Sequence, residues 1–170
     1  MQDMAKKTSA GILLYRIWSG ELQVFIVHPG GPFWARKDAG AWSIPKGEPD
    51  QASDLLETAK REFHEETGKP VTGEFLPLTP LKQPSGKTVH AWAVNGDIDP
   101  ATLKSNTFTM EWPPRSGRQQ AFPEVDRGGW FTIAEARKKL VPGQVGFLSE
   151  LQDKVGRAGS AREPGSPSPV

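Results

Sequence analysis

Short apolar runs separated by Gly, Ser and Pro recur along the chain, a pattern that predicts β-strands. The predicted strands cover residues 8–15, 22–27, 73–83, 87–95 and 125–131. The first two runs are joined through Ser19-Gly20, and Ser85-Gly86 lies between the third and fourth. Both dipeptides are typical of tight turns, so each pair of runs is predicted to form a β-hairpin.

A helical period replaces this pattern over residues 55–67. Its apolar residues recur every three or four positions and form one stripe of Leu56, Ala59 and Phe63. Asp54 followed by Glu57 has the spacing of an N-terminal capping box, and Gly68 suits the left-handed residue that ends a helix. We therefore predict a helix between these two signals.

Two shorter helices are predicted over residues 133–140 and 147–154, and a long irregular segment over residues 99–124. A long loop in a compact domain is more often functional than incidental. The order of strands and helices predicts an α+β fold. A flexible N-terminus, one domain and a disordered tail are expected over residues 1–7, 8–155 and 156–170.

Composition narrows the class of protein. The chain has 170 residues, which suits one domain with its own core, and a formal net charge of +1, which gives no global attraction to nucleic acid or anionic membranes. It has no cysteine, which excludes disulfides, thiolate zinc sites and a cysteine nucleophile. We see no signal peptide and no apolar run of membrane length, so we expect a cytoplasmic protein; a homodimer stays open.

Three carboxylates share one face of the predicted helix. Glu62, Glu65 and Glu66 are related by steps of three and four residues. Carboxylates held this close repel one another unless a hard cation lies among them, and oxygen ligands favour Mg²⁺, Mn²⁺ or Ca²⁺. The alternative is an ordinary solvated helix surface.

The segment before this helix, residues 42–48, predicts a short apolar strand that breaks at Pro45 and Gly47, with Lys46 at the bend. Such a loop would bring a lysine and backbone carbonyls next to the carboxylate face. Together the two segments predict a site that surrounds a phosphate.

Residues 47–69 resemble the signature of the Nudix hydrolase family: glycine, five residues, glutamate, seven residues, then Arg-Glu-bulky-x-Glu-Glu-x-Gly-bulky. The positions in register are Gly47, Arg61, Glu62, Phe63, Glu65, Glu66 and Gly68. Two positions depart from the pattern. Ser53 stands where the family has glutamate, and Lys69 where it has an apolar residue. Neither normally provides a principal metal ligand, so the departures concern loop geometry and the helix end.

The resemblance extends over roughly residues 8–152. Residues 10–16 resemble the family's opening strand, and residues 123–126 its late acidic loop. The run from His28 to Glu48 resembles a bacterial branch of predicted nucleoside triphosphate pyrophosphohydrolases. Its Pro-Lys-Gly is similar to that of diadenosine polyphosphate hydrolases.

The resemblance implies an α/β/α sandwich around a mixed sheet, and hydrolysis of a phosphoanhydride by water with Mg²⁺, or Mn²⁺, as cofactor. The implied metal ligands are the Gly47 carbonyl, Glu62, Glu65 and Glu66. Glu65, Glu66 and Glu124 are catalytic candidates, with Glu66 and Glu124 serving as metal ligand or general base. Arg61 would orient a carboxylate, although an exposed pair with Glu65 would give the same sequence pattern.

Cations and aromatic residues near these motifs are candidates for substrate binding. Phosphate would be bound by Lys46, Arg36 and Arg115, with Lys37 and Arg118 also available. Trp34 and Trp42 would stack on a base, with Phe33 or Trp112 as the second side of a clamp. The alternative for each cation is an ordinary surface charge, and for each aromatic residue a place in the core.

The expected substrate is a nucleotide: a dinucleoside polyphosphate or a nucleoside triphosphate. Two alternatives remain, an RNA 5′-pyrophosphohydrolase, which would need a local basic groove, and a non-catalytic nucleotide-binding domain. The intact set of glutamates makes the last the weakest.

Overall fold

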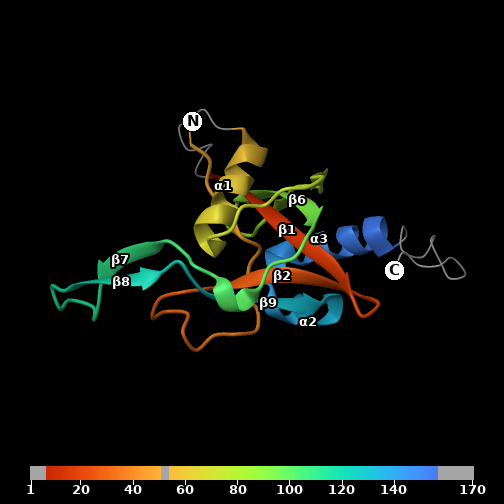
Figure 1. The fold of residues 1–170 in the computed structure, drawn as a ribbon. Helices are drawn as coiled ribbons and strands as arrows, with labels where there is room; N and C mark the ends of the chain where they lie inside the picture. Colours follow the sequence, from red (N-terminus) through yellow and green to blue (C-terminus); the bar gives the residue numbers. More distant parts are fainter. Residues whose placement is uncertain (1–6, 51–53, 157–170) are drawn as a thin grey trace, which may run out of the picture.

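The computed structural model describes residues 7–50 and 54–156 (Figure 1). Predictions for residues 1–6 and for the tail beyond residue 156 lie outside the described residues. The strands are β1 (Thr8–Trp18), β2 (Glu21–Pro29), β3 (Lys46–Gly47), β4 (Leu76–Pro77), β5 (Leu81–Lys82), β6 (Thr88–Asn95), β7 (Thr107–Glu111), β8 (Gln119–Pro123) and β9 (Val125–Thr132). The α-helices are α1 (Leu55–Thr67), α2 (Ile133–Lys139) and α3 (Val145–Leu151). Short helical turns are η2 (Pro100–Thr102), η3 (Pro142–Gln144) and η4 (Gln152–Gly156).

The main sheet is mixed and has the central order β4-β6-β1-β2-β9. Strand β1 pairs in parallel with β6 and antiparallel with β2, and β2 pairs antiparallel with β9. The turn between β1 and β2 consists of Ser19 and Gly20, whose φ angles of 51° and 81° are both left-handed. This conformation matches the twist of a two-residue hairpin. The predicted hairpin is confirmed.

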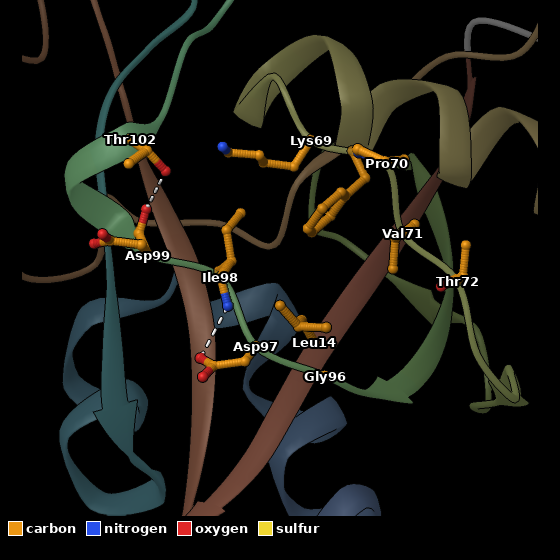
Figure 2. Close-up of a pocket in the computed structure, with 11 residues that line it drawn as sticks. Leu14, Lys69, Pro70, Val71, Thr72, Gly96, Asp97, Ile98, Asp99 and Thr102 are labelled. Atoms are coloured by element: carbon orange, nitrogen blue, oxygen red, sulfur yellow. Dashed lines mark hydrogen bonds between the residues drawn. The ribbon is translucent and has the colours of Figure 1, made fainter.

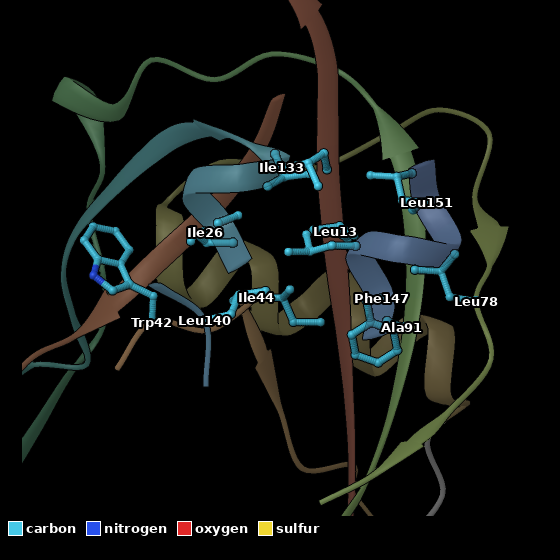
Figure 3. Packing of buried hydrophobic residues seen from close by; sticks show 14 of the residues in the cluster. Leu13, Ile26, Trp42, Ile44, Leu78, Ala91, Ile133, Leu140, Phe147 and Leu151 are labelled. Atoms are coloured by element: carbon cyan, nitrogen blue, oxygen red, sulfur yellow. The ribbon is translucent and has the colours of Figure 1, made fainter. Parts of the chain in front are cut away.

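Alternating residues of the sheet point into two apolar clusters. One cluster includes Leu13 and Ile26 of the sheet and Phe147 of α3 (Figure 3). The other includes Phe25 of β2 and Phe63 of α1. Because successive residues of a strand face opposite sides, α1 covers one face of the sheet and α2 with α3 covers the other. The predicted α+β fold, with its α/β/α sandwich and mixed sheet, is confirmed.

Helix α1 spans the predicted residues 55–67. Gly68 ends it with φ 80° and donates its N–H to the His64 carbonyl, as predicted. The predicted capping box is wrong, because the exposed Asp54 side chain makes no cap hydrogen bond. A capping box is present instead at the start of α2, between Thr132 and Glu135.

Two predicted strands are shorter than expected. Within residues 73–83 only β4 and β5 form, each two residues long. Pro80 lies between them and has no N–H with which to extend a ladder. Residues 42–44 make only isolated bridges, and the strand pairing falls on β3, opposite Ala10 and Gly11 of β1.

The prediction of an irregular segment over residues 99–124 is wrong. It contains η2 and the antiparallel hairpin β7–β8, which extends away from the main sheet in Figure 1. Phe108 and Met110 are half-buried whereas Thr107 and Thr109 are exposed, so β7 alternates with the period of a strand. No helix of the described residues is long and apolar enough to cross a membrane.

Candidate active site

The site begins where α1 contacts the loop that precedes it. Phe63 is buried and anchors α1 to the sheet, which turns Glu62, Glu65 and Glu66 toward the loop side. A methyl group at Gly47 would overlap the Glu62 carboxylate. A side chain at position 47 would therefore displace the Glu62 carboxylate from where the loop touches the helix.

Arg61 fastens this loop to the helix. Its Nη2 donates to Glu62 Oε2 at 3.0 Å and to the Glu48 carbonyl at 3.1 Å. Its Nε lies 3.5 Å from Glu65 Oε2, and its Nη1 lies 3.3 Å from Asp50 Oδ2. The hydrogen bond to Glu62 raises the pKa of Arg61. One guanidinium thus orients two carboxylates and the loop backbone.

Lys46 joins β3 to the end of α1. Its backbone N–H favours the ionised form of the Glu66 carboxylate and lowers the pKa of Glu66, against the larger effect of burial. Burial lowers the pKa of its ammonium group, and the nearby Lys87 lowers it further. Lys87 is itself paired with Glu48 at 3.0 Å, which leaves Lys46 as the cation that faces Glu66.

A cavity of about 170 Å³ brings together Lys46, Glu66 and Glu124. These residues come from β3, from α1 and from the junction of β8 and β9. Val27 and Ile44 form part of the apolar wall. The three charged groups that the sequence places far apart therefore share one small cavity.

Backbone hydrogen bonds hold Glu124 beside α1. Its N–H donates to the Asn106 carbonyl at 2.8 Å, and the Asn106 N–H donates to the Glu65 carbonyl at 2.8 Å. The Gly30 N–H donates to the Glu124 carbonyl at 3.0 Å. Sequence reasoning missed Asn106, because a bridge made by backbone atoms leaves no signature in the residue type.

The carboxylates of the site oppose one another's ionisation. Burial, and then the charge of Glu62, raises the pKa of Glu66 to about 8. Burial also raises the pKa of Glu62, and that of Glu124, where the charges of Glu62 and Glu65 add to the effect. The site therefore holds more negative charge than Lys46 and Arg61 neutralise.

This donor set fits a hard divalent cation. Its side-chain donors are all oxygens, and the unbalanced negative charge is what such an ion would offset. As they stand, no three Asp, Glu or His side chains among the described residues converge closely enough to hold an ion. Two of the oxygens are turned to Arg61, at Glu62 and Glu65.

Trp42 does not have the predicted stacking position. Its side chain is buried, 3% exposed, and its indole N–H donates to Asp38 Oδ1 at 2.7 Å. Phe131 packs edge-on against its ring at 5.2 Å, and His28 does so at 5.3 Å. No face of the ring is open to a base. The prediction that Trp42 stacks on a base is wrong, and Trp42 is a core residue.

His28 has a structural position at the end of β2. It is fully buried, and its Nδ1 lies 2.8 Å from Asp126 Oδ1. Its Nε2 lies 2.6 Å from the Lys37 carbonyl. The ring thereby connects the loop after β2 to β9.

The remaining candidates lie on exposed loops. Phe33 and Trp34 are 60% and 40% exposed, and Phe33 packs edge-on against Trp112 with ring centroids 5.6 Å apart. Arg36 and Arg115 are exposed and form no ion pair with any described residue. None of these five residues lines the cavity that Glu66 and Glu124 line.

A larger cavity, of about 500 Å³, lies at the C-terminal end of α1 (Figure 2). Its polar groups are used within the loop that lines it: Asp97 accepts from the Ile98 N–H, and the Asp99 carbonyl accepts from the Thr102 hydroxyl. None of the carboxylates of the candidate site lines it. Size alone therefore does not mark the site.

Fold and site together indicate a class: a hydrolase in which Glu66 of α1, the half-buried Lys46 and Glu124 line one small cavity. The comparison with protein families agrees. Residues 7–151 match the model of the NUDIX domain, and the chain belongs to the Nudix family. Membership makes it a hydrolase that acts on pyrophosphate bonds, and members of the family generally use divalent metal ions.

Solved structures share the fold at low identity. A C. elegans Ap4A hydrolase in a binary complex has a TM-score of 0.62 at 18% identity, over 88% of this chain and 98% of that one. The Nudix domain of Shewanella oneidensis NrtR, complexed with ADP ribose, has a TM-score of 0.57 at 16% identity, over 89% of this chain and 87% of that one. The MutT protein of Methanosarcina mazei has a TM-score of 0.58 at 18% identity, over 87% of this chain and 94% of that one. At these identities the likeness concerns the fold alone.

Proposed function

We propose that this protein hydrolyses a phosphoanhydride bond of a nucleoside polyphosphate, either a dinucleoside polyphosphate or a nucleoside triphosphate, with Mg²⁺ or Mn²⁺ as cofactor. The observation that carries the proposal is the 170 Å³ cavity that unites Lys46, Glu66 and Glu124. Its size suits a phosphate group, and its charges suit an anion bound through a cation.

The metal would be held by Glu62, Glu65, Glu66 and the Gly47 carbonyl. When bound, it would neutralise phosphate oxygens and lower the pKa of the attacking water. Arg61 orients Glu62 and Glu65 for this task through the contacts described above. Lys46 supplies a further positive charge to the phosphates.

In the proposed reaction the oxygen of water forms a bond to phosphorus as the bridging P–O bond breaks. The leaving phosphate takes the electron pair of that bond. The proton of the water passes to a carboxylate of the cavity, and Glu66 and Glu124 are the two candidates. Support for Glu66 comes from its pKa, which burial raises to about 8, because a base whose pKa lies near neutral pH accepts a proton efficiently. Burial raises the pKa of Glu124 as well.

One alternative has a specific observation in its favour. Exposed arginines and aromatic rings on the loop that starts at Gly30, among them Arg36 and Trp34, would suit the 5′ end of an RNA. We propose Trp34, Arg36 and Arg115 as residues that bind the substrate. A cytoplasmic location and a homodimer stay predictions from the sequence.

The test is a phosphate-release screen with Mg²⁺ or Mn²⁺ over nucleoside triphosphates, dinucleoside polyphosphates, nucleotide sugars and 5′-triphosphate RNA. We expect metal-dependent turnover that Glu66→Gln reduces by at least about a hundredfold, the scale of a lost general base. Glu57→Gln is the matched control, because Glu57 is an exposed glutamate of α1 whose ion pair among the described residues is with Lys60. Nucleotide binding without turnover would instead support a binding domain.

A further inference from the structure

Two exposed segments leave the candidate site from the same point. One is the loop of residues 30–37 and the other is the hairpin β7–β8; we call the pair the wing. Gly30 donates to the Glu124 carbonyl, and Glu124 directly follows the last residue of β8. A methyl group at Gly30 would overlap the Pro123 carbonyl oxygen. The wing therefore begins at the wall of the cavity that holds Glu124.

The two segments of the wing are packed together. A methyl group at Gly31 would lie 2.9 Å from the Phe108 ring of β7. Farther out, Phe33 meets Trp112 edge-on at an angle of 84°. Loop and hairpin therefore form one unit, and its aromatic residues are supported by one another.

The surface of the wing is aromatic and positively charged. Phe33 and Trp34 are the most exposed rings of the wing, and Lys37 Nζ lies 5.4 Å from the Trp34 centroid. Its exposed arginines form no ion pair with described residues: Arg36, Arg115 and Arg118. The carboxylate of Glu111 accepts from the Gly117 N–H within the hairpin turn. A ligand that combines anionic groups with a flat ring would complement this surface.

The cavity at the carboxylates is too small for a whole nucleotide. Sites that enclose a ligand of that size measure about 300–1,000 Å³, against about 170 Å³ here. The larger cavity in Figure 2 is lined by two aspartates and a single lysine, Lys69, which does not suit a polyphosphate. Neither of these two cavities therefore suits a whole dinucleoside polyphosphate.

We infer that the wing binds the second nucleoside and the distal phosphates of a dinucleoside polyphosphate. Trp34 stacks on the base, and Arg36 with Arg115 contacts the phosphates beyond the bond that is cut. The inference rests on the proposed function, since the wing acts on a substrate whose phosphoanhydride lies at Glu66. It makes the wing the element that distinguishes a substrate with two nucleosides from one with a single nucleoside.

The experiment compares two substrates with the same number of phosphates, a dinucleoside tetraphosphate and a nucleoside tetraphosphate. We expect Trp34→Ala to lower the ratio of their kcat/KM values by about 5- to 150-fold, the range for loss of one stacked base. Arg115→Gln, at the exposed hairpin turn, should lower the same ratio and weaken its dependence on salt. Trp18→Ala is the matched control, because Trp18 is 53% exposed at the far β1–β2 turn.

Each outcome separates the two proposals. Equal losses for both substrates would overturn the inference and leave the hydrolase standing. If wild-type protein turned over neither tetraphosphate nor any nucleoside triphosphate, the proposed function would fail, and calorimetry with a non-hydrolysable dinucleoside tetraphosphate would test the wing by itself. In that calorimetry experiment, an affinity that neither Trp34→Ala nor Arg115→Gln changes would overturn the inference about the wing. If the wing variants reduced turnover of 5′-triphosphate RNA only, the ligand of the wing would be RNA and not a dinucleoside polyphosphate.

Discussion

At the scale of single residues, the candidate site combines one rigid contact with excess negative charge. Gly47 lets the loop touch Glu62, and Arg61 fixes two of the carboxylates. Ionised Glu66 is disfavoured first by its burial and then by the charges of Glu62 and Glu124, which the nearby Lys46 offsets in part. These residues would gain most from a bound dication.

Replacing Glu66 by glutamine should stabilise the metal-free protein. The pKa of Glu66 rises from 4.5 to about 8 on folding, so the folded state binds the extra proton between these values and stability falls as pH rises through them. Near pH 7 the free energy of unfolding of Glu66→Gln should exceed that of wild type by about 1–3 kcal/mol in chelator. Urea unfolding measures this difference.

The same variant should lose the stabilisation that Mg²⁺ gives to wild type, because a ligand that binds only the folded state raises the midpoint of thermal unfolding. Glu57→Gln serves again as the control and should respond to Mg²⁺ as wild type does. A Glu66→Gln protein that is less stable than wild type in chelator would show that the ionised Glu66 does not destabilise the metal-free fold.

At the scale of elements, the loop after β2 is held to both α2 and the core. Asp38 accepts from Lys139 Nζ of α2 at 2.9 Å and from the Trp42 indole at 2.7 Å. The Lys37 carbonyl is held by His28 in addition. These anchors fix the base of the loop and leave Phe33 and Trp34, farther out, exposed.

The anchor at Asp38 predicts a pH-dependent loss of stability. Hydrogen bonds from Lys139 and then Trp42 hold the pKa of Asp38 below its ordinary value of 3.8. A lowered carboxyl pKa stabilises the fold above the unfolded value, and this contribution is lost as pH falls through the folded value. Asp38→Asn should therefore cost under about 1 kcal/mol near pH 7, since the group is exposed.

Urea unfolding of wild type and Asp38→Asn from pH 7 down to about pH 3 measures the effect, and the gap between them should shrink below pH 3.8. Glu21→Gln is the control, because Glu21 is an exposed carboxylate without an ion pair among the described residues. If the difference in free energy of unfolding between wild type and Asp38→Asn stayed constant with pH, the destabilisation would not come from the charge of Asp38.

At the scale of the whole molecule, one sheet supports both apolar clusters. Phe25 and Val27 of β2 face α1, whereas Val24 and Ile26 of the same strand face the other side. Neither cluster can come apart without exposing residues of β2. The two halves of the sandwich should therefore unfold together.

Truncating a buried ring on either side tests this coupling. Phe63→Ala and Phe147→Ala each remove a side chain that is 1% exposed or less, and each should lower the free energy of unfolding by about 3–5 kcal/mol. Far-ultraviolet circular dichroism and tryptophan fluorescence should give coincident transitions in both variants. Separate transitions for the two probes in either variant would show that the clusters unfold independently.

Local features of the chain were predictable where a single element contains its own signal. The bounds of α1, the left-handed Gly68 and the Ser19-Gly20 hairpin each depend on neighbouring residues only. The set of glutamates on one helix face is equally local. The hairpin β7–β8 was missed because its half-buried residues pack against the loop of residues 30–37, a partner distant in sequence.

By itself the sequence determined the fold class, the helix that carries Glu62, Glu65 and Glu66, and the glycine at which the loop meets it. Only the tertiary structure decided that Trp42 is core, that Asn106 joins Glu124 to α1, and that the wing starts at the cavity. Residue types and spacing specify periodicity and turns over a few positions. Burial, and the backbone hydrogen bonds between distant segments, follow from packing the whole chain, which no short stretch of it contains.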